Sequence, residues 1–105
     1  MGTIVGKMGD FPVGSIKEVS AQGKAYAISN VGGMLYATDG RCGHDGGILS
    51  HGHLVGIVVT CPKHGAQYDV TTGKSLKRPY VPFAKAPRLK AYKVTVDGEN
   101  VILEI

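Results

Sequence analysis

The sequence contains no tryptophan and only two cysteines, and it has no long apolar run. Two cysteines cannot supply the several cross-links of a small disulfide-rich secreted domain. The longest apolar run, residues 54–59, is six residues long, whereas a membrane-spanning helix needs about 20. No secretion signal opens the chain. We therefore expect a cytoplasmic protein without a membrane anchor.

Glycine, by contrast, is abundant, with 16 among 105 residues, about twice the usual share of ~7%. Such a composition favours short strands and tight turns over long helices. Alternating or β-branched segments predict strands at residues 15–19, 25–28, 34–37, 57–60, 68–70, 90–96 and 100–105. Turns are expected at 22–23, 30–33, 71–73 and 97–98. We predict an all-β fold, an antiparallel β sandwich or small barrel, in a single domain spanning 1–105.

Two segments interrupt this series of strands, and long loops in a compact domain usually carry function. Residues 39–53 are rich in glycine, histidine and cysteine, and residues 77–87 contain three prolines. The histidines at 51 and 53 are expected to lie in a solvated turn. The candidate metal ligands instead lie in two short motifs, each of which contains one cysteine and one histidine.

Cys42 and His44 form a C-x-H pair, and Cys61 and His64 form a C-x-x-H pair that follows a predicted strand. Thiolate and imidazole suit zinc or iron–sulfur chemistry. Zinc fingers usually place two cysteines on one arm and two histidines on the other, whereas each arm here is mixed. A mixed arm suits a two-iron cluster in which one iron takes both cysteines and the other takes both histidines. A structural zinc module that binds nucleic acid is the alternative.

These motifs resemble those of soluble Rieske-type [2Fe–2S] ferredoxins, in particular the ferredoxin components of ring-hydroxylating dioxygenase systems. The similarity is carried by residues 42–47 and 61–65, by Tyr68 and Asp69, and by Thr72 and Gly73. The segments 10–14 and 87–92 are similar in a weaker way, so the resemblance covers essentially the whole chain.

The resemblance implies one [2Fe–2S] cluster, with Cys42 and Cys61 on the inner iron and His44 and His64 on the outer iron. The cluster-binding loops would be about 40–50 and 61–67, and a proline-bearing loop at about 77–87 would cover the cluster. The implied function is one-electron transfer from a reductase to a terminal oxygenase, without an enzymatic reaction of the chain's own. The alternative within the same family is a small subunit of a fixed redox complex, of the nitrite-reductase type.

Comparison with respiratory members of the family implies how the chain sets the reduction potential of the cluster. These add a disulfide between the loops, and Gly47 and Lys63 stand at the corresponding positions here. They also carry a serine where this chain has Ala66. Fewer hydrogen bonds stabilise the reduced state less, so the comparison implies a low potential, and it implies no disulfide between the loops. The Tyr68 hydroxyl either reaches the Cys42 sulfur or packs in the core.

Positive charge is concentrated in one part of the sequence. The formal net charge is +4, and residues 74–93 hold seven of the twelve lysines and arginines and no acidic residue. This segment either docks an acidic face of a redox partner or is a solvated edge whose lysines discourage strand pairing. We expect a monomer that binds no nucleic acid.

Overall fold

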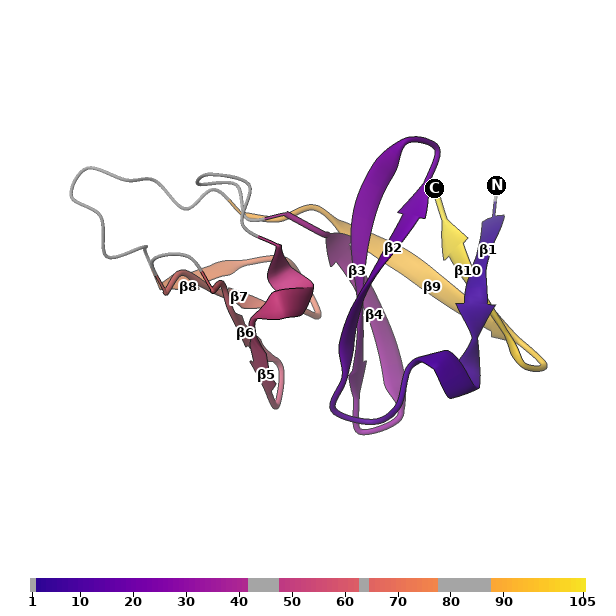
Figure 1. Ribbon diagram of the computed structural model, residues 1–105, viewed down its shortest axis with the longest axis horizontal. Coiled ribbons are helices and arrows are strands. Elements are labelled where there is room, and N and C mark those ends of the chain that lie inside the picture. The colour runs from indigo at the N-terminus through magenta and orange to yellow at the C-terminus, as the bar shows by residue number, and fades with distance from the viewer. Residues whose placement is uncertain (1, 42–47, 63–64, 78–87) are drawn as a thin grey trace.

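The computed structural model describes residues 2–41, 48–62, 65–77 and 88–105. These residues form ten strands and two short 3-10 helices (Figure 1): β1 (Gly2–Lys7), η1 (Met8–Asp10), β2 (Ile16–Ala21), β3 (Lys24–Val31), β4 (Met34–Asp39), η2 (Leu49–His51), β5 (His53–Val55), β6 (Val58–Thr60), β7 (Gln67–Asp69), β8 (Ser75–Lys77), β9 (Ala91–Asp97) and β10 (Asn100–Glu104). The prediction of an all-β fold is confirmed.

The larger of two antiparallel sheets has six strands in the order β1-β10-β9-β4-β3-β2. Its two edge strands, β1 and β2, approach each other, so the sheet is a nearly closed barrel. Alternate residues of the strands fill its interior, because successive side chains of a strand point to opposite faces. The barrel core contains Phe11, Tyr26, Ile28, Ala37, Val101 and Leu103.

The smaller sheet has four strands in the order β5-β6-β7-β8 and lies to one side of the barrel (Figure 1). Leu54, Val59 and Tyr68 are register partners across β5, β6 and β7, so they share one face. That face belongs to a second core, against which Ile16 and Val31 of the barrel pack. The smaller sheet is therefore held to the barrel by apolar contacts as well as by the chain.

Several elements differ from the expectation. The sequence did not predict β1, β5 or β8; β5 and β8 have three residues each, too few to show alternation. Asn30 and Val31 were expected in a turn, but they end β3. The Asn30 side chain accepts a hydrogen bond from Gly33 N–H and donates one to the Phe11 carbonyl, so only residues 32–33 make the turn.

The expectation for the two extra histidines is partly wrong. His51 lies in η2 and His53 begins β5, so the segment is not a simple turn. Both side chains are nevertheless exposed. No helix among the described residues is long and apolar enough to cross a membrane.

Candidate metal centre

Cys61 directly follows β6, and its side chain is 1% exposed. Its backbone N–H donates a 2.7 Å hydrogen bond to the carbonyl of Ala66. Gly65, just before Ala66, has a φ of 71°, in the left-handed region that favours glycine. The chain thus reverses tightly between β6 and β7, and this reversal is where the second C-x-x-H motif lies in the sequence.

Among the residues that the structure describes, Cys61 is surrounded mainly by buried apolar side chains. It belongs to a buried cluster whose other members are Leu49, Val59, Ala66, Tyr68, Val70 and Leu89, each at most 2% exposed. A sulfur ligand in this position is shielded from water, and cysteine is the ligand that iron–sulfur clusters take. The one predicted ligand that the structure describes therefore fits a buried iron–sulfur centre.

The two residues expected to tune the cluster also lie in this core. Tyr68 and Ala66 are both fully buried. Burial of the Tyr68 ring agrees with packing in the core. A hydrogen bond from its hydroxyl to the Cys42 sulfur stays a prediction, because Cys42 lies outside the described residues.

Cys42, His44 and His64 lie outside the described residues, as do 78–87 of the proline-bearing loop. Among the residues that the structure describes, no three histidine, cysteine or carboxylate side chains gather into a metal site. The ligand set predicted from the sequence is therefore tested here only through Cys61 and through the stems of the loops.

The stem of the first loop is closed. Arg41 and Ile48, which flank the undescribed residues 42–47, form an antiparallel bridge, and Leu49 N–H donates to the Gly40 carbonyl at 3.1 Å. Arg41 also makes a two-bond ion pair with Glu18 of β2, at 2.9 and 3.1 Å. Because Leu49 belongs to the same core as Cys61, the stems of both cysteine loops meet there.

The return of the third loop is anchored to the same core by Leu89, which is 2% exposed. Leu89 N–H donates to the Gly73 carbonyl at 2.8 Å, and an Arg88 guanidinium N–H donates to the Thr72 carbonyl at 2.7 Å. Gly73 has a φ of 80°, and a Cβ there would collide with the Leu89 carbonyl oxygen. Only glycine allows the two backbones to approach this closely, which accounts for the glycine at position 73.

Asp69 fixes the turn that leads to Gly73. Its carboxylate accepts the backbone N–H of Thr71 at 2.8 Å and the Thr71 hydroxyl at 2.6 Å. Desolvation alone would raise the pKa of Asp69, but hydrogen bonds from Thr71 and Thr72 outweigh it and hold the pKa below its usual value.

A polar network that the sequence did not indicate joins three strands. Asp39, at the end of β4, accepts the Tyr92 hydroxyl at 2.7 Å and pairs with Lys24 Nζ at 2.9 Å. Lys24 Nζ also donates to the Tyr92 hydroxyl oxygen at 2.7 Å. Desolvation opposes ionisation of Asp39, but hydrogen bonds from Lys24, from Lys90 N–H and from Tyr92 lower its pKa. The hydrogen bonds that Lys24 makes with Tyr92 and with Asp39 raise the pKa of Lys24.

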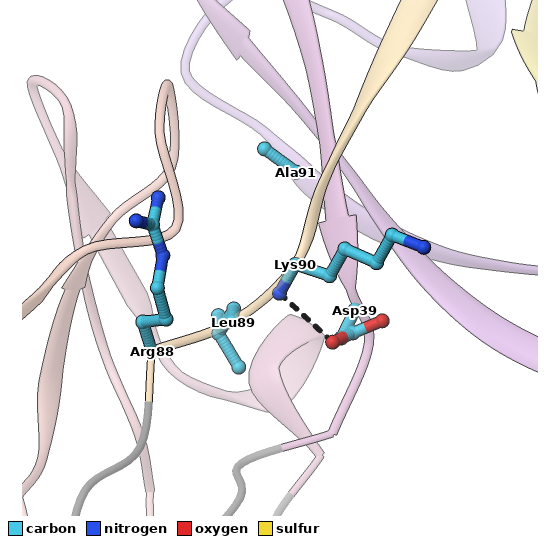
Figure 2. A pocket seen from close by; sticks show the side chains of 5 residues that line it. All are labelled: Asp39, Arg88, Leu89, Lys90 and Ala91. Carbon is cyan, nitrogen blue, oxygen red and sulfur yellow. Dashed lines mark hydrogen bonds between the residues drawn. The ribbon is translucent and has the colours of Figure 1, made fainter.

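The network borders a pocket of about 410 Å³, which is lined by Asp39, Arg88, Leu89, Lys90 and Ala91 (Figure 2). Lys24 and Tyr92 are 68 positions apart. Neither residue stands out from other strand residues in the sequence. They are brought together only by the pairing of β3, β4 and β9 in the fold.

Comparison with known proteins places this geometry in a family. The Rieske [2Fe-2S] domain matches residues 2–99. The chain is 33% identical over 96 residues to the ferredoxin component of a naphthalene 1,2-dioxygenase system from Pseudomonas aeruginosa, covering 91% of this chain and 88% of the relative. It is 34% identical over 97 residues to the 3-phenylpropionate/cinnamic acid dioxygenase ferredoxin subunit of Shigella boydii, covering 91% and 86%.

Solved structures agree with this assignment. The chain resembles a ferredoxin of Sphingomonas yanoikuyae B1 with a TM-score of 0.88 at 25% identity, covering 100% of this chain and 99% of the other. It also resembles a chain in a complex of reduced oxygenase and oxidised ferredoxin of carbazole 1,9a-dioxygenase, with a TM-score of 0.85 at 31% identity, covering 97% and 91%. The predicted resemblance is confirmed, and with it the [2Fe–2S] cofactor of the family: this chain belongs to the Rieske [2Fe–2S] domain family.

Proposed function

We propose that this chain is a soluble one-electron carrier that takes electrons from a reductase and passes them to a terminal oxygenase. The observation that carries the proposal is the match of residues 2–99 to the Rieske domain in a chain whose relatives are named ferredoxin components of dioxygenase systems. The chain would transfer electrons without a catalytic site of its own. A cytoplasmic monomer that binds no nucleic acid is part of the same proposal.

The whole chain, 1–105, would form one Rieske domain that binds one cluster. Cys42 and Cys61 would hold the inner iron, and His44 and His64 the outer iron. Support comes from the stems of the three loops, which are all anchored to the core around Cys61. When bound, the cluster supplies reversible one-electron oxidation and reduction. The chain's own part is to supply the ligands and to keep water from the cysteine side.

The basic segment 74–93 is the proposed docking surface for acidic faces of the redox partners. Four of its seven cationic residues, Lys74, Arg88, Lys90 and Lys93, are exposed. Complementary charge raises association rates more than it raises affinity, which suits a carrier that must bind and leave two partners in turn. A solvated edge without a docking role is the competing interpretation.

The cofactor assignment is tested on the purified holoprotein by iron, sulfide and zinc analysis, together with visible absorbance and electron paramagnetic resonance (EPR) of the reduced protein. We expect equal amounts of iron and sulfide, and a coloured protein. Cys61→Ser and His64→Gln should lose the cluster. His53→Gln is the matched control, because this histidine is exposed at the start of β5 and lies outside the motif. A colourless protein that holds zinc would overturn the proposal.

The carrier role is tested separately from the cofactor. The holoprotein should be reduced by the reductase of a dioxygenase system and reoxidised by a terminal oxygenase. Purification of the native protein in a constant ratio with larger redox subunits, with no transfer by the isolated chain, would favour the subunit of a fixed complex instead.

A further inference from the structure

The chain passes between the barrel and the smaller sheet at two crossings that lie side by side. It leaves the barrel at the end of β4, which we call the outgoing crossing, and returns at the start of β9, which we call the returning crossing (Figure 1). Thr38 is paired with Ala91, and Asp39 N–H donates to the Lys90 carbonyl at 3.0 Å. All four predicted cluster ligands lie in sequence between these two crossings. Two neighbouring crossings are the geometry of a hinge.

The carboxylate of Asp39 cross-links the two crossings. One oxygen accepts the backbone N–H of Lys90 at 2.9 Å, as Figure 2 shows. The other accepts the Tyr92 hydroxyl at 2.7 Å and pairs with Lys24 at 2.9 Å. Asp39 thereby ties the outgoing crossing to the returning one and to β3. We refer to Lys24, Asp39 and Tyr92 as the crossing clamp.

Tyr92 in turn is held by the barrel. Its ring lies edge-on to the ring of Tyr26, with centroids 4.9 Å apart at 87°, and Tyr26 belongs to the barrel core. The Lys90 ammonium lies 5.4 Å from the centre of the Tyr92 ring, within the range of a cation–π interaction. The clamp therefore packs against the barrel core through Tyr92, and Asp39 binds the returning crossing through the Lys90 N–H.

The ion pair between Arg41 and Glu18 lies near the clamp but is not part of it. It is also partly exposed and has similar distances, and Arg41 directly precedes the first predicted ligand. It joins Arg41, just beyond β4, to β2 of the barrel, and it does not include the returning crossing. It is the natural control for the clamp.

We propose that Asp39 and Tyr92 are positioning residues that fix the orientation of the cluster-binding part relative to the barrel. The inference rests on the proposed function as an electron carrier. Lys90, just before β9, is the contact of Asp39 outside the barrel strands, so rotation of the smaller sheet about the paired crossings would strain the hydrogen bond between the Lys90 N–H and Asp39. Transfer between two proteins depends on how the docked carrier presents its cluster, whereas a small reductant in solution does not depend on that orientation.

Tyr92→Phe is the main test, because it removes the hydroxyl, keeps the ring and leaves the net charge unchanged. Asp39→Asn is the second variant, and Glu18→Gln is the control for the neighbouring ion pair. Each is measured as the holoprotein with full cluster content. The measurements are reduction by dithionite, reduction by the partner reductase, and hydrogen exchange of the Asp39 and Lys90 amides.

In Tyr92→Phe and Asp39→Asn we expect exchange of the two amides to rise about tenfold, the reductase rate to fall at least about threefold, and the dithionite rate to stay the same. Glu18→Gln should leave the exchange of the two amides and the dithionite rate unchanged. Unchanged reductase rates, or equal slowing with both reductants, would overturn the clamp proposal. A wild-type holoprotein that dithionite reduces but no reductase does would instead contradict the carrier function. The clamp would then be judged by the exchange of the two amides, and unchanged exchange would overturn it.

Discussion

The backbone N–H of Cys61 donates a 2.7 Å hydrogen bond to the carbonyl of Ala66, and both residues are almost completely buried. This bond closes the reversal that contains the second motif. It also places Ala66, one of the two residues expected to tune the cluster, in the same buried core as the cysteine. A hydroxyl introduced at Ala66 would therefore enter a region of low dielectric, where hydrogen bonds to charged groups are strong.

Ala66→Ser should raise the reduction potential by about 60 mV, which for one electron corresponds to about 1.4 kcal/mol. A hydroxyl donor stabilises the more negative, reduced state more than the oxidised state. Voltammetry of wild type and variant in one buffer measures the change. Ala37→Ser is the matched control, because Ala37 is equally buried but lies in the barrel core, and its potential should not move. A lower or unchanged potential in Ala66→Ser, with an intact spectrum, would contradict the inferred geometry of the loop.

Removal of the cluster should loosen the loop stems before the barrel. Ligation supplies folding free energy to the segments that it joins, and the sequence predicts no disulfide to replace it. We expect hydrogen exchange of Leu49 and Cys61 to accelerate in the apoprotein, within the loops at about 40–50 and 61–67. The β9–β10 hairpin, which is paired along its length, should keep its protection. Equal protection of the loop amides with and without the cluster would contradict this.

Docking through the basic segment should depend on salt. Exposed charges are screened within about 8–10 Å at physiological ionic strength, so the rate of association with the partner should fall steeply as salt rises. Reversal of Lys74 and Lys77 to glutamate should slow electron transfer without moving the potential.

The matched control for docking is the reversal of Lys7 and Lys17, which are exposed on β1 and β2. It changes the net charge by the same amount and should slow transfer less. If both double variants slow transfer equally, net charge alone is responsible. If neither salt nor reversal matters, the basic segment is a solvated edge.

How much of this molecule the sequence predicts depends on how local each signal is. The ligand motifs can be recognised in the sequence because residues such as Cys61 and His64 lie within a few positions of each other, and they stay a prediction. The β9–β10 hairpin was predicted correctly because its alternation is strict. β1 was missed because Gly2 and Gly6 interrupt its alternation of polar and apolar residues. The strand is stabilised instead by its antiparallel pairing with β10, which lies far away in the sequence. The crossing clamp was missed because its geometry arises from strand register between distant segments.

Asp69 should make stability sensitive to acid. Its pKa in the folded protein lies below the usual value of 3.8, so its contribution is fully present above about pH 5 and is lost as the pH falls through the folded-state pKa. Asp69→Asn should lower the free energy of unfolding at pH 7 by about 1 kcal/mol, a value reduced for the exposure of the group. The difference between variant and wild type should shrink toward pH 3, as measured by urea unfolding.

Asp97→Asn is the control for acid sensitivity, because Asp97 is exposed at the end of β9. It should leave the unfolding free energy nearly unchanged at both pH values. A loss in Asp69→Asn that is the same at pH 3 and pH 7 would show that the carboxylate charge is not what the Thr71 contacts stabilise.

Gly73→Ala and Gly98→Ala separate backbone strain from close packing at the third loop. Both glycines have a left-handed φ, 80° and 63°, but a Cβ at Gly98 meets nothing within 4 Å, whereas one at Gly73 collides with the Leu89 carbonyl oxygen. Gly98→Ala should cost about 1–2 kcal/mol of unfolding free energy from the left-handed backbone alone. Gly73→Ala should cost at least about 1 kcal/mol more, because Leu89 must leave the core around Cys61 or the turn must shift. Thermal unfolding measures the cost, and loss of visible absorbance at a lower temperature in Gly73→Ala alone would report the displaced stem. Equal costs and equal absorbance in both variants would mean that the contact between Gly73 and Leu89 does not anchor the loop.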